Sequence, residues 1–184
     1  MELIQTNIPG CYELQPKILR DDRGSFIKTF HQDVFAGYGL HTDFVEEYYS
    51  ISHHNVLRGL HFQLPPKHHV KVVYCVQGQV VDVVVDLRLK SPTYGKWQTF
   101  DLSDAKANLI YIPSGLAHGF YVTSPTAILL YKVSTVYAPE CDAGILWNSA
   151  DIPWQCQNPI ISQRDRNLIS HADFESPFIY GENS

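Results

Sequence analysis

The sequence predicts an all-β protein: an antiparallel β-barrel of the jelly-roll type with short helical turns and an irregular C-terminal extension. Short apolar or alternating segments recur about every ten residues between clusters of Gly, Pro, Asn, Asp and Ser, as in β-sandwiches and barrels. Helical periodicity is confined to residues 32–40 and 103–109, enough for a turn or two in each. The 184 residues, of which 45% are hydrophobic, suit a single domain spanning residues 1–184.

The predicted strands follow one another along the chain without an internal repeat. In order, they are residues 25–30, 44–52, 69–76, 78–87, 96–102, 108–113, 119–122 and 127–134, and residues 55–76 are expected to hold one more strand before the Pro-Pro turn. From Ile152 onward the sequence is interrupted by prolines, which predicts an irregular extension that wraps the barrel.

Composition excludes several classes of partner. The net charge of −5 argues against a nucleic-acid binder, which needs a broad basic surface, so an anionic ligand must meet a local basic cluster. The N-terminal segment has no basic region followed by an apolar run, and Asp82 and Asp86 interrupt the longest apolar stretch. We therefore expect a cytoplasmic protein without a membrane partner. The four cysteines lack CxxC spacing, which predicts buried free thiols rather than a zinc ribbon or a disulfide framework.

Strand alternation places polar side chains in rows. Asp82, Asp86 and Arg88 share one face of their predicted strand. On the preceding predicted strand, Lys71 shares a face with the apolar residues Val73 and Cys75. A polar row inside a small barrel needs internal hydrogen-bond partners or lines a ligand cavity. For Asp86 and Arg88, exposure to bulk solvent is the alternative. The apolar members of these faces are Val73, Cys75 and Val84, and the opposite face of the second strand consists of Val81, Val83, Val85 and Leu87.

The segment from residue 55 to 76 joins two predicted strands through a Pro-Pro turn and carries many cationic and imidazole groups. One explanation is a metal site, but the segment contains no Asp or Glu, and we expect no metal. A second explanation is a solvated turn, because the first residues after the two prolines are expected to be exposed. The imidazoles considered as ligands are His61, His68, His69 and His118, and the turn residues are Lys67, His68 and His69.

A third explanation is an acid–base and anion-binding site built on Arg58, His61 and Lys71. The rest of the chain offers partners for it. A carboxylate that fixes the tautomer of an imidazole makes it a competent base, and Asp165 is a candidate partner of His61. A buried structural histidine is the alternative. Further candidates are His118 in "IPSGLAHGF" and Tyr131 in "LLYKVS".

Six motifs, in order along nearly the whole chain, carry a resemblance to a known family. They are "LRDDRGSF" (19–26), "NVLRGLHFQLPP" (55–66), "KVVYCVQGQVVDVVVDLRLKSPTYGKW" (71–97), "YIPSGLAHGFYV" (111–122), "LLYKVSTVYAP" (129–139) and "IISQRD" (160–165). Together they resemble the dTDP-4-dehydrorhamnose 3,5-epimerase family. The resemblance implies a metal-free cupin jelly roll without a cofactor, usually a homodimer. Its expected substrate is a nucleotide-linked 4-keto-6-deoxy sugar in deoxysugar and polysaccharide biosynthesis.

The same resemblance implies roles for individual residues. His61 would be the base that removes a proton next to the ketone, with Asp165 orienting it. Lys71 would stabilise the enolate oxygen, and Tyr131 would donate a proton on the opposite ring face. The implied substrate-binding residues are Arg58, Arg23, Phe26 (packing on the nucleotide base), His118, Glu46, Tyr48 and Arg164.

Regular alternation would point Arg58 and His61 to opposite faces, because they are three positions apart. We expect a bulge at Gly59 to turn both side chains inward.

Several positions depart from the family pattern. "EEYYS" stands where the family commonly has "QDNHS", so Glu46 and Tyr48 replace an amide pair. These changes leave open an altered nucleotide preference or epimerisation at carbon 3 or carbon 5 alone. The residues also leave open a sugar-binding cupin without turnover and a metal-dependent cupin isomerase or dioxygenase. The further departures are Lys28, Tyr49 and Val136.

Overall fold

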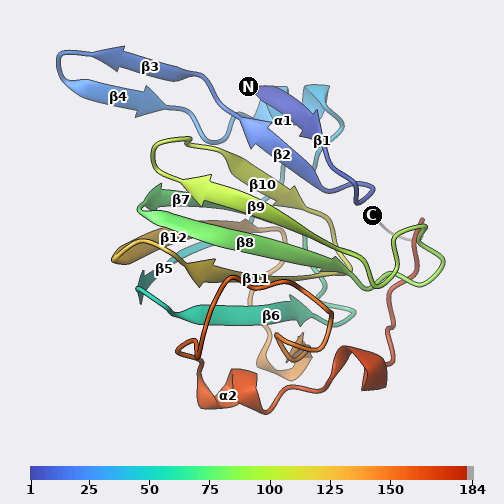
Figure 1. Cartoon of the computed structure of the whole chain (residues 1–184). Coiled ribbons are helices and arrows are strands. Elements are labelled where there is room, and N and C mark those ends of the chain that lie inside the picture. The colour runs from blue at the N-terminus through green and yellow to red at the C-terminus, as the bar shows by residue number, and fades with distance from the viewer. Residues whose placement is uncertain (182–184) are drawn as a thin grey trace.

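The computed structural model describes residues 1–181 and consists mainly of two antiparallel sheets that pack face to face (Figure 1). The first sheet has the order β1-β2-β10-β7-β12-β5 and the second the order β13-β6-β11-β8-β9. The predicted jelly-roll β-barrel is thus confirmed. In the first sheet the strands are β1 (Glu2–Gln5), β2 (Tyr12–Gln15), β10 (Leu109–Ile112), β7 (Lys71–Gln77), β12 (Thr126–Val133) and β5 (Glu46–His53). In the second they are β13 (Asp142–Gly144), β6 (Leu57–Gln63), β11 (Leu116–Val122), β8 (Gln79–Asp86) and β9 (Trp97–Ser103).

The central core lies between the two sheets and contains the inward side chains that strand alternation predicted. Val73 and Leu129 from the first sheet meet Val84 and Phe120 from the second, and each is at most 2% exposed. Burial of these apolar faces on both sheets is the main force that holds the barrel closed.

The polar row on β8 faces inward and is fully partnered. Arg88 donates to Asp86 through Nε and Nη2 at 2.8 Å, and Ser91 and Thr93 donate to the same carboxylate. Burial raises the pKa of Asp86, but these hydrogen bonds outweigh it and hold the pKa below its usual value. The alternative of a solvent-exposed row is therefore wrong for Asp86 and Arg88, which are 0% and 6% exposed.

The outer face of the second sheet and part of the outer face of the first are covered by other parts of the chain. The C-terminal extension, with α2 (Gln163–Arg166) and η2 (His171–Asp173), runs beneath the second sheet in Figure 1. A further 3₁₀ turn, η1 (Pro139–Cys141), directly precedes β13. The side chains Trp154, Phe174 and Phe178 of the extension pack on the outward valines of β8, as a wrapping extension requires. Helix α1 (Gln32–Gly37) covers the first sheet through Phe35.

The prediction of a second helical turn at residues 103–109 is wrong. Ser103 ends β9 and Leu109 begins β10, so the intervening residues form a turn between strands. Ala107 there has a φ of 53°, in the left-handed region, which ends helical propagation after a single bond from its N–H to Ser103 O. Within residues 1–181, no helix has the length and apolar character needed to cross a membrane.

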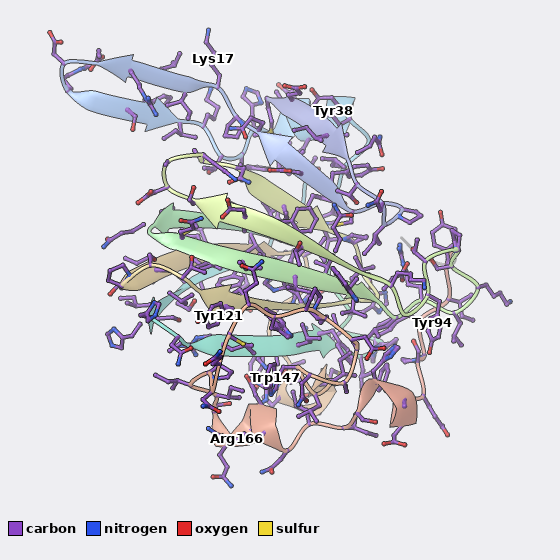
Figure 2. The ribbon with its side chains drawn as sticks, viewed as in Figure 1. Lys17, Tyr38, Tyr94, Tyr121, Trp147 and Arg166 are labelled. Carbon is purple, nitrogen blue, oxygen red and sulfur yellow. The ribbon has the colours of Figure 1, made fainter. Side chains whose placement is uncertain are left out.

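A two-stranded hairpin, β3 (Ile18–Asp21) and β4 (Gly24–Ile27), extends away from the two sheets at the upper left of Figure 1. Lys17 at its base also points away from the sheets (Figure 2). Leu19 and Phe26 of the hairpin are 48% and 62% exposed. The hairpin therefore presents apolar surface that its own chain does not cover.

The expected bulge at Gly59 is confirmed. On β6 and β11, His61 pairs with His118 but Arg58 pairs with Phe120, so three steps along β6 match two along β11. Gly59 has a φ of 130°, and a Cβ there would lie 2.6 Å from the Cα of Gly119. Only glycine fits this position, and the extra residue brings both Arg58 and His61 to the inner side.

Candidate active site

A cavity of about 390 Å³ opens between the two sheets and is lined by residues from both. It brings together eight of the predicted site residues: Glu46, Tyr48, Arg58, His61, Lys71, His118, Tyr131 and Arg164. Asp165 lies directly behind His61. The described lining adds Ser50, Phe62, Gln63, His69, Gly119, Phe120, Val133, Thr135, Tyr137 and Asp142.

His61 and Asp165 form a hydrogen-bonded pair at the wall of the cavity. Nε2 of His61 lies 2.8 Å from Oδ1 of Asp165, and Oδ2 accepts the backbone N–H of Gly59 at 3.1 Å. Since the carboxylate accepts, Nε2 carries a proton, and in the neutral imidazole Nδ1 is the nitrogen with the lone pair. Burial raises the pKa of Asp165, but the hydrogen bonds from His61 and Gly59 outweigh it and keep the pKa low. The His61 side chain is 28% exposed, so the imidazole is accessible to a ligand.

Helix α2 sets the position of Asp165. Ser162 caps the helix by accepting the backbone N–H of Asp165 at 3.0 Å. This single turn buries Asp165 toward β6, while Arg166 next to it points outward to solvent (Figure 2). The chain thus brings a carboxylate from the C-terminal extension to a histidine on a central strand.

Lys71 is the buried cation of the cavity. Its side chain enters from β7, is 6% exposed, and donates from Nζ to the backbone carbonyl of His61 at 3.2 Å. Burial lowers the pKa of Lys71 to about 8, against the attraction of Asp142 and Asp82. Lys71 is therefore mostly an ammonium at neutral pH and loses its charge at moderately alkaline pH.

Tyr131 faces the cavity from β12, on the sheet opposite His61. Its phenol oxygen lies 3.3 Å from the Oγ of Ser50. Burial raises the pKa of Tyr131 well above its usual value, so the phenol keeps its proton throughout the neutral range. A protonated group and an unprotonated imidazole nitrogen thus approach the cavity from two sides.

His118 was expected to contact the substrate, but its side chain is almost fully buried. Nε2 donates to both carboxylate oxygens of Asp82, at 2.8 and 3.0 Å, and the two side chains are 4% and 0% exposed. Burial raises the pKa of Asp82, although the contact with His118 acts against it. His118 lines the cavity and Asp82 pairs with it without reaching the lining, which gives a second histidine–carboxylate pair that the sequence did not predict.

Polar side chains at the cavity hold one another in place. Arg58 donates from Nε to Ser52 Oγ at 2.9 Å and from Nη2 to Ile51 O at 3.4 Å, so Nη1 keeps its donor capacity for a ligand. Arg164 donates to Asp142 at 2.8 Å. Glu46 accepts the backbone N–H of Tyr137 at 2.7 Å, which turns its carboxylate toward the cavity.

Some of the residues that depart from the family pattern line the cavity, and others lie outside it. Tyr48 lines the cavity but is 41% exposed, and its ring is stacked on Tyr131 at a centroid distance of 4.8 Å and an interplanar angle of 15°. Tyr49 is 65% exposed, and neither Tyr49 nor Val136 is among the described lining residues. Tyr137, beside Val136, supplies an aromatic hydroxyl at the cavity and donates it to Asp142.

Two expected site residues, Arg23 and Phe26, lie outside this cavity. Both are on the extended hairpin, where Arg23 is paired with Asp21 and has a side chain that is 90% exposed. Local alternation predicts a strand there, but it does not tell where a protruding hairpin points. Neither residue can reach a ligand in the cavity of its own chain in this arrangement.

The turn residues Lys67, His68 and His69 are half-buried, so the expectation of an exposed turn is wrong. Burial lowers the pKa of His69 to about 2, with Lys71 contributing. Gln63 explains the burial, because its side-chain oxygen accepts the N–H of Ala138 and its amide nitrogen donates to Lys67 O.

The same amide nitrogen of Gln63 lies 3.1 Å from Nδ1 of His69. Nδ1 must therefore accept, which fixes His69 as the neutral tautomer with its proton on Nε2. The sequence indicates His69 only as a candidate metal ligand or an exposed turn residue, and does not predict its place in the cavity wall. The signal that could have found it is its place two positions before Lys71, on the same side of the chain.

No three His, Cys, Asp or Glu side chains in the described part of the chain are arranged to hold a metal ion.

Comparison with known proteins agrees with the motifs. The family model described as dTDP-4-dehydrorhamnose 3,5-epimerase matches residues 5–173. The dTDP-4-dehydrorhamnose 3,5-epimerase of Shigella flexneri is 44% identical over 176 residues, which cover 94% of this chain and 97% of the relative. The dTDP-4-dehydrorhamnose 3-epimerase of Streptomyces niveus is 37% identical, with 94% of this chain and 85% of the relative covered.

The fold is matched by solved structures as well. The dTDP-6-deoxy-D-glucose 3,5-epimerase of Legionella pneumophila, crystallised with dTDP-4-keto-L-rhamnose, superposes with a TM-score of 0.90 at 34% identity. The match covers 95% of this chain and 94% of that one. The chain therefore belongs to the dTDP-4-dehydrorhamnose 3,5-epimerase family of jelly-roll cupins.

Proposed function

We propose that this isomerase converts dTDP-4-dehydro-6-deoxyglucose to dTDP-4-dehydrorhamnose by inverting carbons 3 and 5 of the sugar. The observation that carries the proposal is one cavity in which the His61–Asp165 pair and Tyr131 stand on facing sheets, with the Lys71 ammonium beside His61. Inversion requires a base on one side of the ring and a proton donor on the other, and this arrangement supplies both.

In the first step, Nδ1 of His61 takes the proton from a carbon next to the 4-keto group. The electron pair of the C–H bond forms a carbon–carbon double bond, and the carbonyl electrons move to oxygen as an enolate. Lys71 stabilises this negative charge, and Asp165 stabilises the imidazolium that His61 becomes. The low pKa of Asp165 supports its role, since it stays ionised while His61 is protonated.

In the second step, Tyr131 donates its phenol proton to the same carbon from the opposite face of the ring, and the carbonyl re-forms. Tyr131 is then a phenolate and His61 an imidazolium, and proton exchange with water restores both groups. Both transfers use only side chains of this chain, so we propose that no cofactor takes part.

The diphosphate needs cations, and Arg58 and Arg164 are the guanidinium groups that line the cavity. On each guanidinium, Nη2 already donates within the chain, to Ile51 O from Arg58 and to Asp142 from Arg164. The remaining terminal nitrogen, Nη1, suits phosphate oxygens. We propose that these two residues bind the diphosphate of the nucleotide, with Tyr48 and Glu46 contacting the sugar or base and His118 forming the floor beneath it.

Arg23 and Phe26 fit a substrate-binding role only if the protein is a homodimer in which the hairpin of one subunit reaches the cavity of the other. The exposed Leu19 and Phe26 support such an association, because a hairpin with uncovered apolar side chains gains by packing on a second copy. All four cysteines are free thiols, which supports the proposed cytoplasmic location. We further propose that residues 1–184 act as one domain.

Proton exchange followed by NMR tests the function. The protein is incubated in deuterated water with dTDP-4-keto-6-deoxyglucose, and the protons at carbons 3 and 5 are followed separately. Loss of both signals together with inversion is the expected result. Loss of the carbon 3 signal alone would instead match the activity named for the Streptomyces relative. Exchange at neither carbon would contradict the proposal for this substrate.

The His61→Asn variant separates an enzyme from a sugar-binding cupin. An enzyme loses turnover but retains affinity for dTDP, whereas a binding protein has no turnover to lose. Elemental analysis of the purified protein addresses a metal-dependent cupin, for which a stoichiometric metal would be found.

A further inference from the structure

Strand β5 stands at the edge of the first sheet, and its inner face contacts the active groups at every second residue. Ser52 accepts from Arg58, Ser50 lies against the phenol of Tyr131, and Tyr48 stacks on the same ring. The intervening residues Tyr49 and Ile51 are 65% and 54% exposed on the other face. Two of the inward contacts converge on Tyr131.

The two contacts restrict different motions of Tyr131. Tyr48 is paired directly opposite Tyr131 in the β5–β12 register, and its ring lies nearly parallel to the Tyr131 ring at 4.8 Å. The His118 ring lies near the Tyr131 ring as well, with a centroid distance of 6.2 Å and an interplanar angle of 71°. Together, the two neighbouring rings limit rotation of the phenol about its side-chain bonds. Ser50 contacts the oxygen at the end of the ring.

The hydroxyl of Ser50 can also set the direction of the phenol proton, because either oxygen of this pair can be the donor. If Ser50 donates its hydrogen to the Tyr131 oxygen, the Tyr131 proton is free to point into the cavity. After Tyr131 has given up that proton, the same hydrogen bond stabilises the phenolate, because hydrogen bonds to charged oxygens are stronger than those to neutral ones.

We propose that Tyr48 and Ser50 are positioning residues that hold the Tyr131 phenol, and the direction of its proton, for reprotonation of the sugar. The inference rests on the proposed function of Tyr131 as proton donor and adds the groups that act through it. It assigns a role to one of the departures from the family pattern: the phenol of Tyr48, in place of an amide, covers a face of the Tyr131 ring.

The inference predicts a change in one step and not in the other. The base His61 does not contact Tyr48 or Ser50 among the hydrogen bonds of the described residues, so proton removal continues when these residues are changed. Reprotonation from the Tyr131 side slows. His61 then returns a deuteron from solvent to the same face of the sugar, so deuterium enters the recovered starting material. The rate of inversion becomes lower than the rate of exchange.

The experiment measures the ratio of deuterium exchange to inversion in Ser50→Ala and Tyr48→Ala. We expect inversion to fall by about 10-fold in each variant, the effect of losing one such contact in a transition state. In Ser50→Ala, exchange at saturating substrate should fall less than about 2-fold. Tyr48→Ala also loses a proposed substrate contact, so for this variant the expected result is a rise in the ratio of exchange to inversion. Tyr48→Phe keeps the stacked ring and should restore the wild-type ratio. Tyr49→Ala, on the outer face of the same strand, is the matched control and should leave both rates unchanged.

Crystal structures of Ser50→Ala and Tyr48→Ala give a second readout that does not depend on the substrate. We expect the Tyr131 phenol oxygen to move by about 1 Å or to occupy two positions, enough to impair a proton transfer. A Tyr131 that keeps its position in both variants overturns the inference, and so does an unchanged exchange-to-inversion ratio. If Tyr131→Phe itself leaves inversion intact, the proposed role of Tyr131 fails, and this result is distinct from a failure of the two positioning residues alone.

Discussion

Nε2 of His61 and Oδ1 of Asp165 lie 2.8 Å apart although 104 residues separate them in the sequence. The histidine is on a central strand of the barrel, and the aspartate is on a one-turn helix of the C-terminal extension. The extension therefore does more than cover the second sheet, because it completes the pair that the proposed chemistry needs.

Replacing Asp165 with Asn should reduce kcat by about 100- to 10,000-fold, the range typical of a disabled acid–base group. An amide can donate to Nε2, which would put the imidazole proton on Nδ1 and remove the lone pair that faces the substrate. Steady-state kinetics with the 4-keto sugar should show KM changed far less than kcat. A variant with wild-type kcat would show that Asp165 is not needed to orient His61.

Activity should fall as the pH rises through about 8, because burial has lowered the pKa of Lys71 to about that value. Below this pH the ammonium is present and stabilises the enolate, and above it the neutral amine does not. A pH profile of kcat at saturating substrate measures this limb. Lys71→Met should remove the limb along with most of the activity, since losing one such donor costs about 100- to 1,000-fold. A profile that stays flat to pH 10 would contradict the assignment.

Much of the site could be predicted from the sequence because strand alternation is a strong constraint. Parity alone placed Lys71 with Val73 and Asp82 with Asp86 on shared faces, and the structure shows that both faces point inward. Alternation fails where the backbone is irregular. The bulge at Gly59 could be foreseen only because Arg58 and His61 were both expected to face inward, a requirement that regular alternation does not meet.

Long-range features were predicted less well. Nothing in the local pattern shows that the hairpin carrying Arg23 and Phe26 extends away from the sheets. The burial of His69 was not predicted, because two prolines normally mark an exposed turn. Here Gln63 holds the turn against the barrel by hydrogen bonds to Lys67 O and His69. Such side-chain contacts between distant residues leave no periodic signal in the sequence.

Replacing Gly59 with Ala should unfold the site. A Cβ at Gly59 would meet the Cα of Gly119 at 2.6 Å, and the φ of 130° is unfavourable for any other residue. We expect a loss of about 3 kcal/mol or more in the free energy of unfolding, measured by urea denaturation. Gly37→Ala is the control, because a Cβ there meets nothing within 4 Å and its helical position tolerates alanine. Equal stability of the two variants would contradict the strained geometry at Gly59.

Replacing Glu46 with Gln should improve the use of a dTDP sugar. Glu46 lines a cavity that we propose binds a diphosphate, and its carboxylate repels that ligand. Glutamine keeps an oxygen that can accept the N–H of Tyr137, so the local geometry is retained while the charge is removed. We expect KM to fall by about 3- to 10-fold with little change in kcat, as removal of one unfavourable charge near a bound anion implies.

The neighbouring residue Glu47 provides the matched control for this change. It lies on the outer face of the same strand, where it forms an ion pair with Lys132. Glu47→Gln removes the same charge from the chain without altering the cavity, so it should leave KM unchanged. If both variants lower KM equally, the effect is one of net charge. If Glu46→Gln raises KM, the carboxylate contacts a hydroxyl or an N–H of the substrate, and Glu46 then selects a nucleotide sugar that offers such a donor at this point.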